Sequence, residues 1–311
     1  MSCVGLRKIG VDAHLYYASG NHAFSLPEWE DGECDESALK DEMHPDLTAF
    51  KWTRPDWCHP VMTETGHALL FSRSLISEFS TFDVVIGHYP FVRFASILRN
   101  DGMITKPYIV CEAGMIRQLD NPTHPEHDAL RGYQDAAIVM YVNVDLLPLL
   151  QAYHVDKFSH YVPLPVDTDK YAPPDLRRND HTVFLCPTRH SWGEKGNDKL
   201  IAAFAEYVKR NPTAELRLCG WGGEDLQASK MMTYRYNLGK NVTWLPIMSK
   251  KKLILEYQKA DVVFDQFVYE ATGSSGPEAM SCGAPLVSRI TPEFFQRLHG
   301  SVPPILNAQE P

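Results

Sequence analysis

Short apolar segments rich in β-branched residues recur along the chain, and stretches with helical periodicity separate many of them. Near-continuous apolar runs of this length are typical of strands that are buried on both faces of a parallel sheet. Their alternation with helices predicts an α/β fold with parallel sheets. The expected strands lie in residues 7–13, 82–88, 106–114, 136–143, 181–187, 214–220, 241–246, 260–267 and 284–288.

Two helices are predicted from their apolar spacing and their end residues. One is capped by Asn197 or Asp198 and runs to residue 210, where an Asn-Pro pair stops it. The other is capped by Ser249 and covers residues 250–260. The residues expected on the buried faces are Leu200, Ile201, Phe204 and Val208 in the first helix, and Leu253, Ile254 and Tyr257 in the second.

The chain is expected to contain two α/β domains. The run PLPVDTDKYAPPDLRRND has four prolines, many charges and no periodicity, which indicates a linker. We therefore expect an N-terminal α/β domain at 1–168, a linker at 169–180 and a C-terminal α/β domain at 181–311. The acidic, aromatic stretch 25–62 is either a surface excursion or a wall or lid over a cleft.

Composition narrows the class of protein. The 311 residues carry a formal net charge of −9, which argues against a non-specific nucleic-acid binder. No apolar run reaches the length of a membrane span, and the N-terminus lacks the apolar core of a signal peptide. No His, Cys and Asp residues show the spacing of a metal site. The scattered cysteines indicate reduced thiols and a cytoplasmic location: Cys3, Cys34, Cys58, Cys111, Cys186, Cys219 and Cys282.

A Gly/Ser loop, residues 272–277, precedes an expected helix near the C-terminus. Ser275 is a plausible N-cap, Pro277 suits the first helical turn, and Glu278 lies in that turn. Free backbone N–H groups at a helix N-terminus make an anion site. The loop is neither a Walker A loop nor a dinucleotide fingerprint. A plain strand-to-helix turn with a capping glutamate is the alternative, but it leaves Glu270 unexplained.

A second candidate anion-binding cluster follows the expected strand 181–187. Arg189 and Lys195 flank Gly193 and precede a helix. The loop lies at the carboxyl end of a strand, where parallel sheets bind ligands. Arg offers a fork and Lys a point charge to a phosphate group. The alternative is a pair of solvated surface cations.

The two glutamates fit a ligand that has hydroxyls at both ends. Glu270 and Glu278 bracket the Gly/Ser loop, and a carboxylate accepts hydrogen bonds well from hydroxyls. A carboxylate beside a diphosphate would be repelled, because both groups are negatively charged. A nucleotide sugar has hydroxyls on its ribose and on its sugar, with the diphosphate between them. One glutamate would therefore hold the ribose and the other the sugar.

Together these motifs resemble those of retaining glycosyltransferases of the GT-B fold, in particular glycosyltransferase family 4. The Glu-x7-Glu motif, here Glu270-ATGSSGP-Glu278 followed by AMSCGAPLV, is the most specific match. Arg189 with Glu194-Lys195-Gly196 is similar, although the family usually has one residue fewer between Arg and Lys. Residues 165–173 resemble the interdomain segment. The resemblance spans roughly residues 80–310 and is weaker in the N-terminal half.

The resemblance implies two facing Rossmann-like domains with a cleft between them, with the donor on the C-terminal domain and the acceptor on the N-terminal one. It implies no metal and no cofactor, because cationic side chains and helix dipoles neutralise the leaving diphosphate. Glu278 would bind the ribose and Glu270 the donor sugar, while Arg189 and Lys195 would stabilise the diphosphate. Residues of the loop would contact phosphate or sugar: Thr272, Gly273, Ser274, Ser275 and Gly276.

Three departures from the family pattern matter. The usual His-Gly at the end of strand 106–114 is replaced by Glu112-Ala113-Gly114, so Glu112, with Arg117 nearby, is either a sugar contact or a strand-end carboxylate paired to a cation. The first Gly-Gly loop is reduced to residues 18–21, where Gly20 either approaches the diphosphate or forms a plain turn. The family usually continues with further helices past the point where this sequence stops, so a fragment and a short member both stay open.

The sequence as a whole predicts a metal-independent hexosyltransferase that retains configuration. It would use a UDP- or GDP-sugar and a glycan, a lipid-linked or a small-molecule acceptor. A GT-B sugar-nucleotide epimerase and a non-catalytic nucleotide-sugar binder are the alternatives. His88 and His14 lie at expected strand ends, where each either touches substrate or is only hydrogen-bonded. The basic run 250–252 hints at peripheral membrane contact, but a solvated helix start explains it better.

Overall fold

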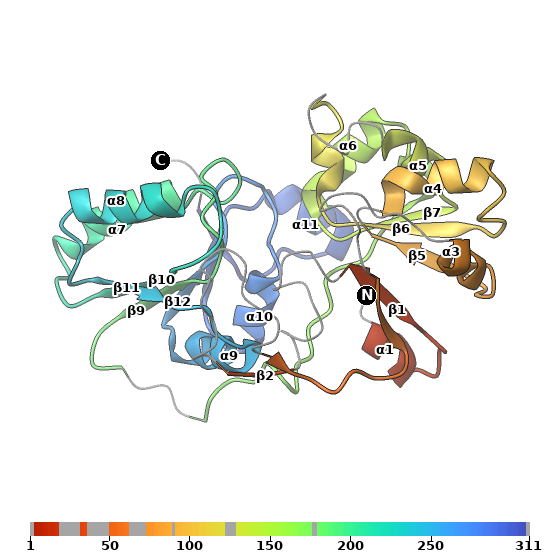
Figure 1. Cartoon of the computed structure of the whole chain (residues 1–311). Coiled ribbons are helices and arrows are strands. Elements are labelled where there is room, and N and C mark those ends of the chain that lie inside the picture. The colour runs from red at the N-terminus through yellow and green to blue at the C-terminus, as the bar shows by residue number, and fades with distance from the viewer. Residues whose placement is uncertain are drawn as a thin grey trace. The chain divides into compact units, whose positions relative to one another are not determined.

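A computed structural model describes residues 3–18, 32–35, 50–61, 73–88, 91–121, 129–175 and 179–308 (Figure 1). These residues divide into two compact units. The first consists of the described residues of Met1–Pro60, Pro165–Pro292 and Val302–Pro311, and the second of those of Val61–Leu164 and Glu293–Ser301. The predicted α/β class with parallel sheets is confirmed. The predicted domain limits stay predictions.

The first unit is built on a sheet that contains six strands in its described part, in the order β11-β10-β9-β12-β13-β14. All neighbouring pairs are parallel. The order reverses between β9 and β12, so the carboxyl ends of these two strands form a topological switch point. The strands are β9 (Val183–Cys186), β10 (Glu215–Cys219), β11 (Val242–Leu245), β12 (Val262–Phe264), β13 (Leu286–Ser288) and β14 (Leu306–Asn307).

Helices cover both faces of this sheet. Figure 1 shows α7 and α8 along one face, with α9 and α10 on the other. Adjacent strand residues point to opposite faces: Phe184 packs in the cluster with α7, and Leu185 packs in the cluster with α9 and α10. The helices are α7 (Asn197–Val208), α8 (Leu226–Arg235), α9 (Lys250–Lys259) and α10 (Ser275–Ser281).

The two predicted helices form, although one N-cap differs. Ser249 caps α9 as predicted, because its hydroxyl accepts a hydrogen bond from the backbone N–H of Lys252 at 3.3 Å. The predicted cap of α7 is wrong. Gly196 is the N-cap, in the left-handed conformation with φ 71°, and Asn197 is the first helical residue. The Asn197 side chain instead accepts from the backbone N–H of Ser191 at 3.0 Å.

The N-terminal residues of the first unit form short elements, and the strand predicted at 7–13 is wrong. The helix α1 (Cys3–Lys8) occupies its start. Ile9 and Val11 are 76% and 45% exposed, so this apolar run has no buried face on which to form a strand. The strands here are β1 (Leu15–Ala18), paired with β4 (Cys58–Val61), and β2 (Glu33–Cys34), antiparallel to β3 (Phe50–Lys51).

The second unit has a four-stranded parallel sheet in its described part, in the order β5-β6-β7-β8. Its strands are β5 (Val85–Gly87), β6 (Tyr108–Glu112), β7 (Ile138–Tyr141) and β8 (Ser159–Tyr161). Its helices are α3 (Arg73–Phe79), α4 (Phe91–Asn100), α5 (Leu130–Gln134), α6 (Leu147–Ala152) and α11 (Pro292–His299), with the 3₁₀ turns η4 (Met115–Gln118), η6 (Val144–Leu146) and η7 (Asp156–Phe158).

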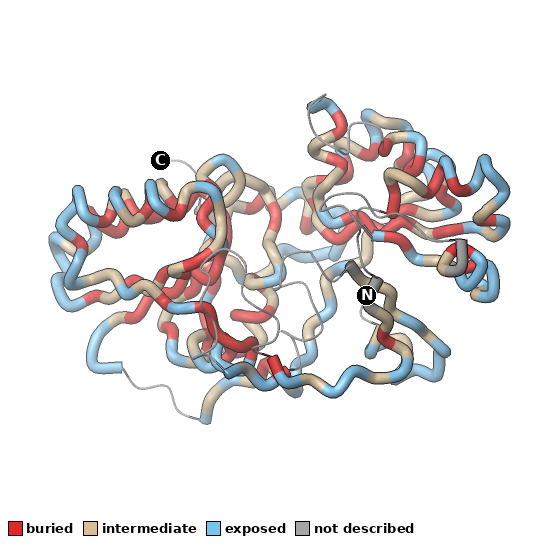
Figure 2. The backbone as a smooth tube through the Cα atoms, in the orientation of Figure 1, coloured by how far each residue is buried: buried red, intermediate tan, exposed pale blue. Residues whose placement is uncertain are grey.

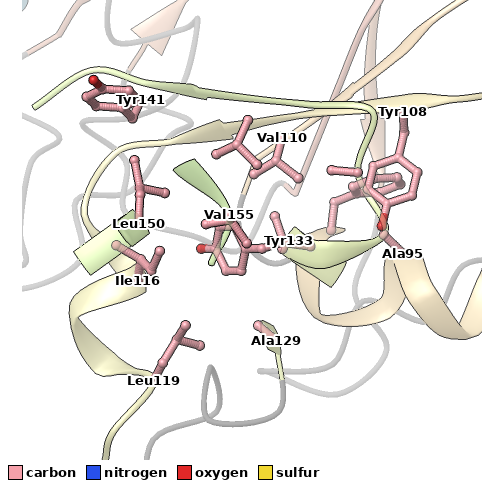
Figure 3. Close-up of a cluster of buried hydrophobic side chains, with 14 of the residues drawn as sticks. Ala95, Tyr108, Val110, Ile116, Leu119, Ala129, Tyr133, Tyr141, Leu150 and Val155 are labelled. Atoms are coloured by element: carbon pink, nitrogen blue, oxygen red, sulfur yellow. The ribbon is translucent and has the colours of Figure 1, made fainter. Parts of the chain in front are cut away.

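The core of the second unit lies between this sheet and its helices (Figure 3). Tyr108 and Val110 of β6 and Leu150 of α6 are fully buried there. The phenol of Tyr108 donates to the carbonyl of Gly132 at 2.7 Å, which satisfies its one polar atom. In both units the buried residues are concentrated in the strands and on the inner faces of the helices (Figure 2).

The state of the cysteines relates to the expected reduced thiols, and the length of the helices relates to the search for a membrane span. Six cysteines are free in the described part of the chain, and all of them except Cys3 are buried. No helix within the described ranges is both long enough and apolar enough to pass through a membrane.

Candidate functional site

The loops that follow β9 and β12 meet at the switch point of the six-stranded sheet. The ammonium of Lys195, in the loop after β9, donates to Oε1 of Gln266 at 2.7 Å. The backbone N–H of Phe267 donates to the carbonyl of Lys195 at 2.9 Å. A predicted cation is therefore fixed at the position where open parallel sheets bind ligands.

Gln266 holds three segments together. Its amide Nε2 donates to the carbonyl of Ala271, the residue before the Gly/Ser loop. Its backbone carbonyl accepts from the N–H of Arg289 at 2.8 Å and from the hydroxyl of Ser288 at 3.1 Å. The side chain is 4% exposed, so these bonds are shielded from water and keep the loops after β9, β12 and β13 in register.

Asp265 shapes the Gly/Ser loop from the end of β12. Its carboxylate, 1% exposed, accepts from the backbone N–H of Gly273 at 2.5 Å and from the hydroxyl of Ser275 at 2.7 Å. The prediction that Ser275 caps the helix is wrong, because α10 begins at Ser275 and the N-cap is Ser274, which makes no side-chain cap bond. The amides of Gly273 and Gly276 are both engaged, by Asp265 and by the carbonyl of Gly273.

Glu278, in the first turn of α10, is 9% exposed and lies in a buried polar cluster. Its Oε1 accepts from the ammonium of Lys250 at 2.8 Å and from the phenol of Tyr171 at 3.4 Å. Its Oε2 accepts from the phenol of Tyr257 at 3.0 Å. Burial, and then the charge of Glu278, raise the pKa of Tyr257 well above its ordinary value, so this phenol keeps its proton and donates. Lys250 is buried, so the expectation of a solvated helix start is wrong there.

Glu270 lies before the loop and is more exposed. Its carboxylate accepts from the hydroxyl of Thr291 and from the guanidinium of Arg289, the latter at 3.0 Å. The Thr291 hydroxyl, and then Arg289, hold the pKa of Glu270 below its usual range. Glu270 is therefore a charged, oriented carboxylate at neutral pH, with 38% of its side chain accessible to a ligand.

Arg189 lies among carboxylates. Its guanidinium pairs with Glu194 in its own loop, and its Nη1 is 3.6 Å from Oε2 of Glu224, which follows β10. The hydroxyl of Ser191 also donates to Glu224, at 2.6 Å. The Arg189 side chain is 45% exposed. A phosphate group that binds here has to compete with two glutamates for this cation.

The loop after β10 is fastened to His190. The N–H of His190 donates to the carbonyl of Gly222, and the N–H of Asp225 donates to the carbonyl of His190, both at 3.1 Å. Gly223 has φ 91°, and a Cβ there would collide with the His190 carbonyl. The buried His190 ring bonds the carbonyl of Cys219 through Nε2 at 2.9 Å, and its Nδ1 has no hydrogen-bond partner in the described part of the chain.

The remaining candidates lie elsewhere. Glu112, in the second unit, is 2% exposed, and its carboxylate accepts from the backbone of Gly114 and Ile116 and from the phenol of Tyr133. Burial raises its pKa. Arg117 pairs with Asp145 at 2.6 Å. Glu112 therefore holds the turn η4. His88 is exposed after β5, and Gly20 lies outside the described residues.

Sequence reasoning missed several residues of this site. Asp265 and Gln266 lie at the carboxyl end of the expected strand 260–267, so the rule that placed Arg189 at a strand end applies to them equally. The sequence pattern placed Lys250 and Tyr257 in an ordinary helix, and it placed Tyr171 in the linker. Across the described ranges, no group of three or more His, Cys, Asp or Glu residues is placed to hold a metal ion.

Comparisons with known proteins indicate what this chain is similar to. Residues 167–294, which include the whole site, match the family model described as "Glycosyl transferases group 1". The D-inositol 3-phosphate glycosyltransferase of Corynebacterium aurimucosum is 29% identical over 195 residues, which cover 55% of this chain and 46% of that protein. The chain thus spans about half the length of this curated relative.

Solved structures identify the fold. Anabaena Alr3699/HepE in complex with UDP and glucose matches with a TM-score of 0.59 and 16% identity, over 75% of this chain and 67% of that one. Sucrose-phosphate synthase from Thermosynechococcus elongatus matches with a TM-score of 0.54 and 18% identity, over 67% and 56%. Such neighbours are GT-B glycosyltransferases, so the expected GT-B fold is confirmed.

Proposed function

We propose that this chain transfers a sugar from a nucleotide-diphosphate donor, and that the donor binds at the switch point between β9 and β12. The observation that carries the proposal is the bond from Lys195 to Gln266, which places a cation between the loop after β9 and the Gly/Ser loop. The match of residues 167–294 to glycosyl transferases, and the UDP and glucose named with the Anabaena structure, support the same chemistry.

The proposed roles follow from charge and exposure. Lys195 and Arg189 would neutralise the diphosphate as it leaves, and this electrostatic stabilisation would be the main catalytic contribution. Glu270, charged and partly exposed, would accept hydrogen bonds from the donor sugar. Glu278 would accept from a ribose hydroxyl through Oε2. Residues of the Gly/Ser loop, Thr272 among them, would contact phosphate or sugar.

The finer features of the reaction belong to the same proposal. They are a hexose donor of the UDP or GDP type, retention of configuration, independence of metal ions and a cytoplasmic location. The acceptor would be a glycan, a lipid-linked sugar or a small molecule. Because of the name of the curated relative, inositol 3-phosphate is the first small molecule to try.

The experiment is a transfer assay with the whole chain. UDP- and GDP-linked hexoses are incubated with a panel of acceptors, including inositol 3-phosphate, with magnesium or with EDTA. Mass spectrometry measures the glycosylated product, and NMR gives its anomeric configuration. We expect product from one donor family, formed equally in EDTA and retaining the donor's configuration.

The Glu270→Gln variant tests the role of Glu270 in the same assay, because it removes the charge but keeps the shape of the side chain. We expect it to bind nucleotide diphosphate as wild type and to form much less product. Donor binding without transfer to any acceptor would instead favour a non-catalytic nucleotide-sugar binder. Conversion of the sugar while it is still attached to its nucleotide would favour an epimerase.

A further inference from the structure

The first basic residue of α9 is buried against the proposed ribose-binding glutamate. Lys250 is 5% exposed, and its ammonium lies 2.8 Å from Oε1 of Glu278 and 5.7 Å from the ring centre of Tyr171. The next residue, Lys251, has a side chain that is 65% exposed. Two adjacent lysines thus have opposite environments, and only one of them faces the site.

The hydrogen bonds around Glu278 leave one free position in a defined direction. A carboxylate oxygen has two lone pairs. On Oε1, Lys250 and Tyr171 use both, whereas Oε2 accepts only from Tyr257 among the described residues. Because these donors come from α9 and from the segment before β9, they fix the plane of the carboxylate and point its remaining lone pair in one direction.

We propose that Lys250 is a positioning residue for nucleotide binding: its buried ammonium fixes Glu278 so that Oε2 presents one acceptor position to a ribose hydroxyl. The inference rests on the proposed function and adds a residue to it. Lys250 itself is 5% exposed, so the role we assign to it is to hold Glu278 and not to contact the donor. A buried carboxylate that loses its paired cation relaxes or finds another partner, because an unpaired buried charge is costly.

Two kinds of ligand distinguish a loss of the ribose contact from general damage to the site. UDP, GDP and ADP carry both a ribose and a diphosphate, whereas inorganic pyrophosphate carries only the group that Arg189 and Lys195 would hold. Isothermal titration calorimetry of the folded chain, well below its melting temperature, measures the affinity for each. The variants are Lys250→Met and its matched control Lys251→Met, which removes a charge from the neighbouring exposed lysine.

We expect Lys250→Met to weaken the preferred nucleoside diphosphate on the order of tenfold, because one charge-assisted hydrogen bond at the ribose contact is lost. Pyrophosphate affinity should stay as in wild type, and Lys251→Met should leave both affinities unchanged. If Lys250→Met does not fold, Lys250→Gln carries the same test, because it keeps a hydrogen-bond donor and removes the charge.

The other outcomes overturn the proposal in distinguishable ways. Equal nucleotide affinity in wild type and Lys250→Met refutes the positioning role alone. Loss of both nucleotide and pyrophosphate binding shows general disruption and also refutes it. If wild type binds pyrophosphate but no nucleotide, or binds neither, the proposed function itself fails and this inference fails with it.

Discussion

Arg189 and Lys195 lie in the same loop but have opposite partners: the guanidinium is paired with carboxylates, whereas the ammonium donates to the neutral amide of Gln266. Among the described residues, Lys195 meets no carboxylate, so its charge is available to a ligand. The charge of Arg189 is already compensated by Glu194 and Glu224. Under the proposed function, a diphosphate would gain a fixed cation from Lys195 and would have to replace the carboxylates that are paired with Arg189.

Lys195→Met should weaken nucleotide diphosphate binding by about tenfold or more, because a charge-assisted contact is removed and no other group replaces it. Calorimetric titration with the preferred nucleotide measures the change. The control is Lys209→Met, which removes a lysine that is 66% exposed and paired with Glu206 on α7. Equal affinity in Lys195→Met and wild type would remove Lys195 from the site.

Glu194→Gln should strengthen nucleotide diphosphate binding by about two- to fivefold. The substitution removes one competitor for the Arg189 guanidinium, and exposed pairs of this kind contribute about 0.2–1 kcal/mol. The effect should disappear when Arg189 is also changed to Met. Weaker binding in Glu194→Gln would show instead that Glu194 orients Arg189 toward the ligand.

Asp265→Asn should lower the free energy of unfolding by about 1–3 kcal/mol, because the buried side chain loses a charged acceptor for Gly273 or Ser275. Ser275→Ala, which removes only one of the two bonds, should cost less. Urea unfolding of both variants measures the difference. A larger loss in Ser275→Ala than in Asp265→Asn would contradict the account of the loop.

His190 should make the protein less stable in mild acid. Burial lowers its pKa to about 4, against the smaller effect of the Cys219 carbonyl. Between pH 6.5 and 4 the unfolded chain binds a proton that the folded chain excludes, so stability falls as the pH falls, by up to about 3 kcal/mol. Above pH 6.5 His190 adds no pH dependence to the free energy of unfolding.

Urea unfolding at pH 7 and pH 5 tests this dependence. His190→Gln should lose stability at pH 7 but show a smaller difference between the two pH values than wild type. His160→Gln, at an exposed position of β8, should keep the wild-type difference. If His190→Gln lost as much stability between pH 7 and pH 5 as wild type does, this pH dependence would arise from other groups.

The sequence predicted the sheets well, because apolar strands that are buried on both faces leave a strong pattern. It also placed Arg189, Lys195 and the Gly/Ser loop at strand ends. The strand at 7–13 failed because the run has β-branched residues but, as the exposure of Ile9 shows, no partner surface. The residue pattern of one segment cannot show whether a distant segment of the chain packs against it.

The same limit explains the site residues that were missed. Lys250 and Glu278 are 28 residues apart, and nothing in the local spacing distinguishes Lys250 from the exposed Lys251. Local rules also misassigned caps. Ser275 has the right residue type for an N-cap, but its hydroxyl is taken by Asp265, ten residues earlier in the chain. Tertiary contacts decide such cases.

The most direct test of the central claim is a thermal-shift panel of UDP, GDP and ADP, with magnesium and with EDTA, on wild type and on the double variant Arg189→Met/Lys195→Met. A ligand that binds only the folded state raises its melting temperature. We expect one nucleotide to raise the melting temperature of wild type equally in both buffers, and the double variant to lose the shift. A shift that survives in the double variant, or no shift in wild type with any nucleotide, would contradict a donor site at this switch point.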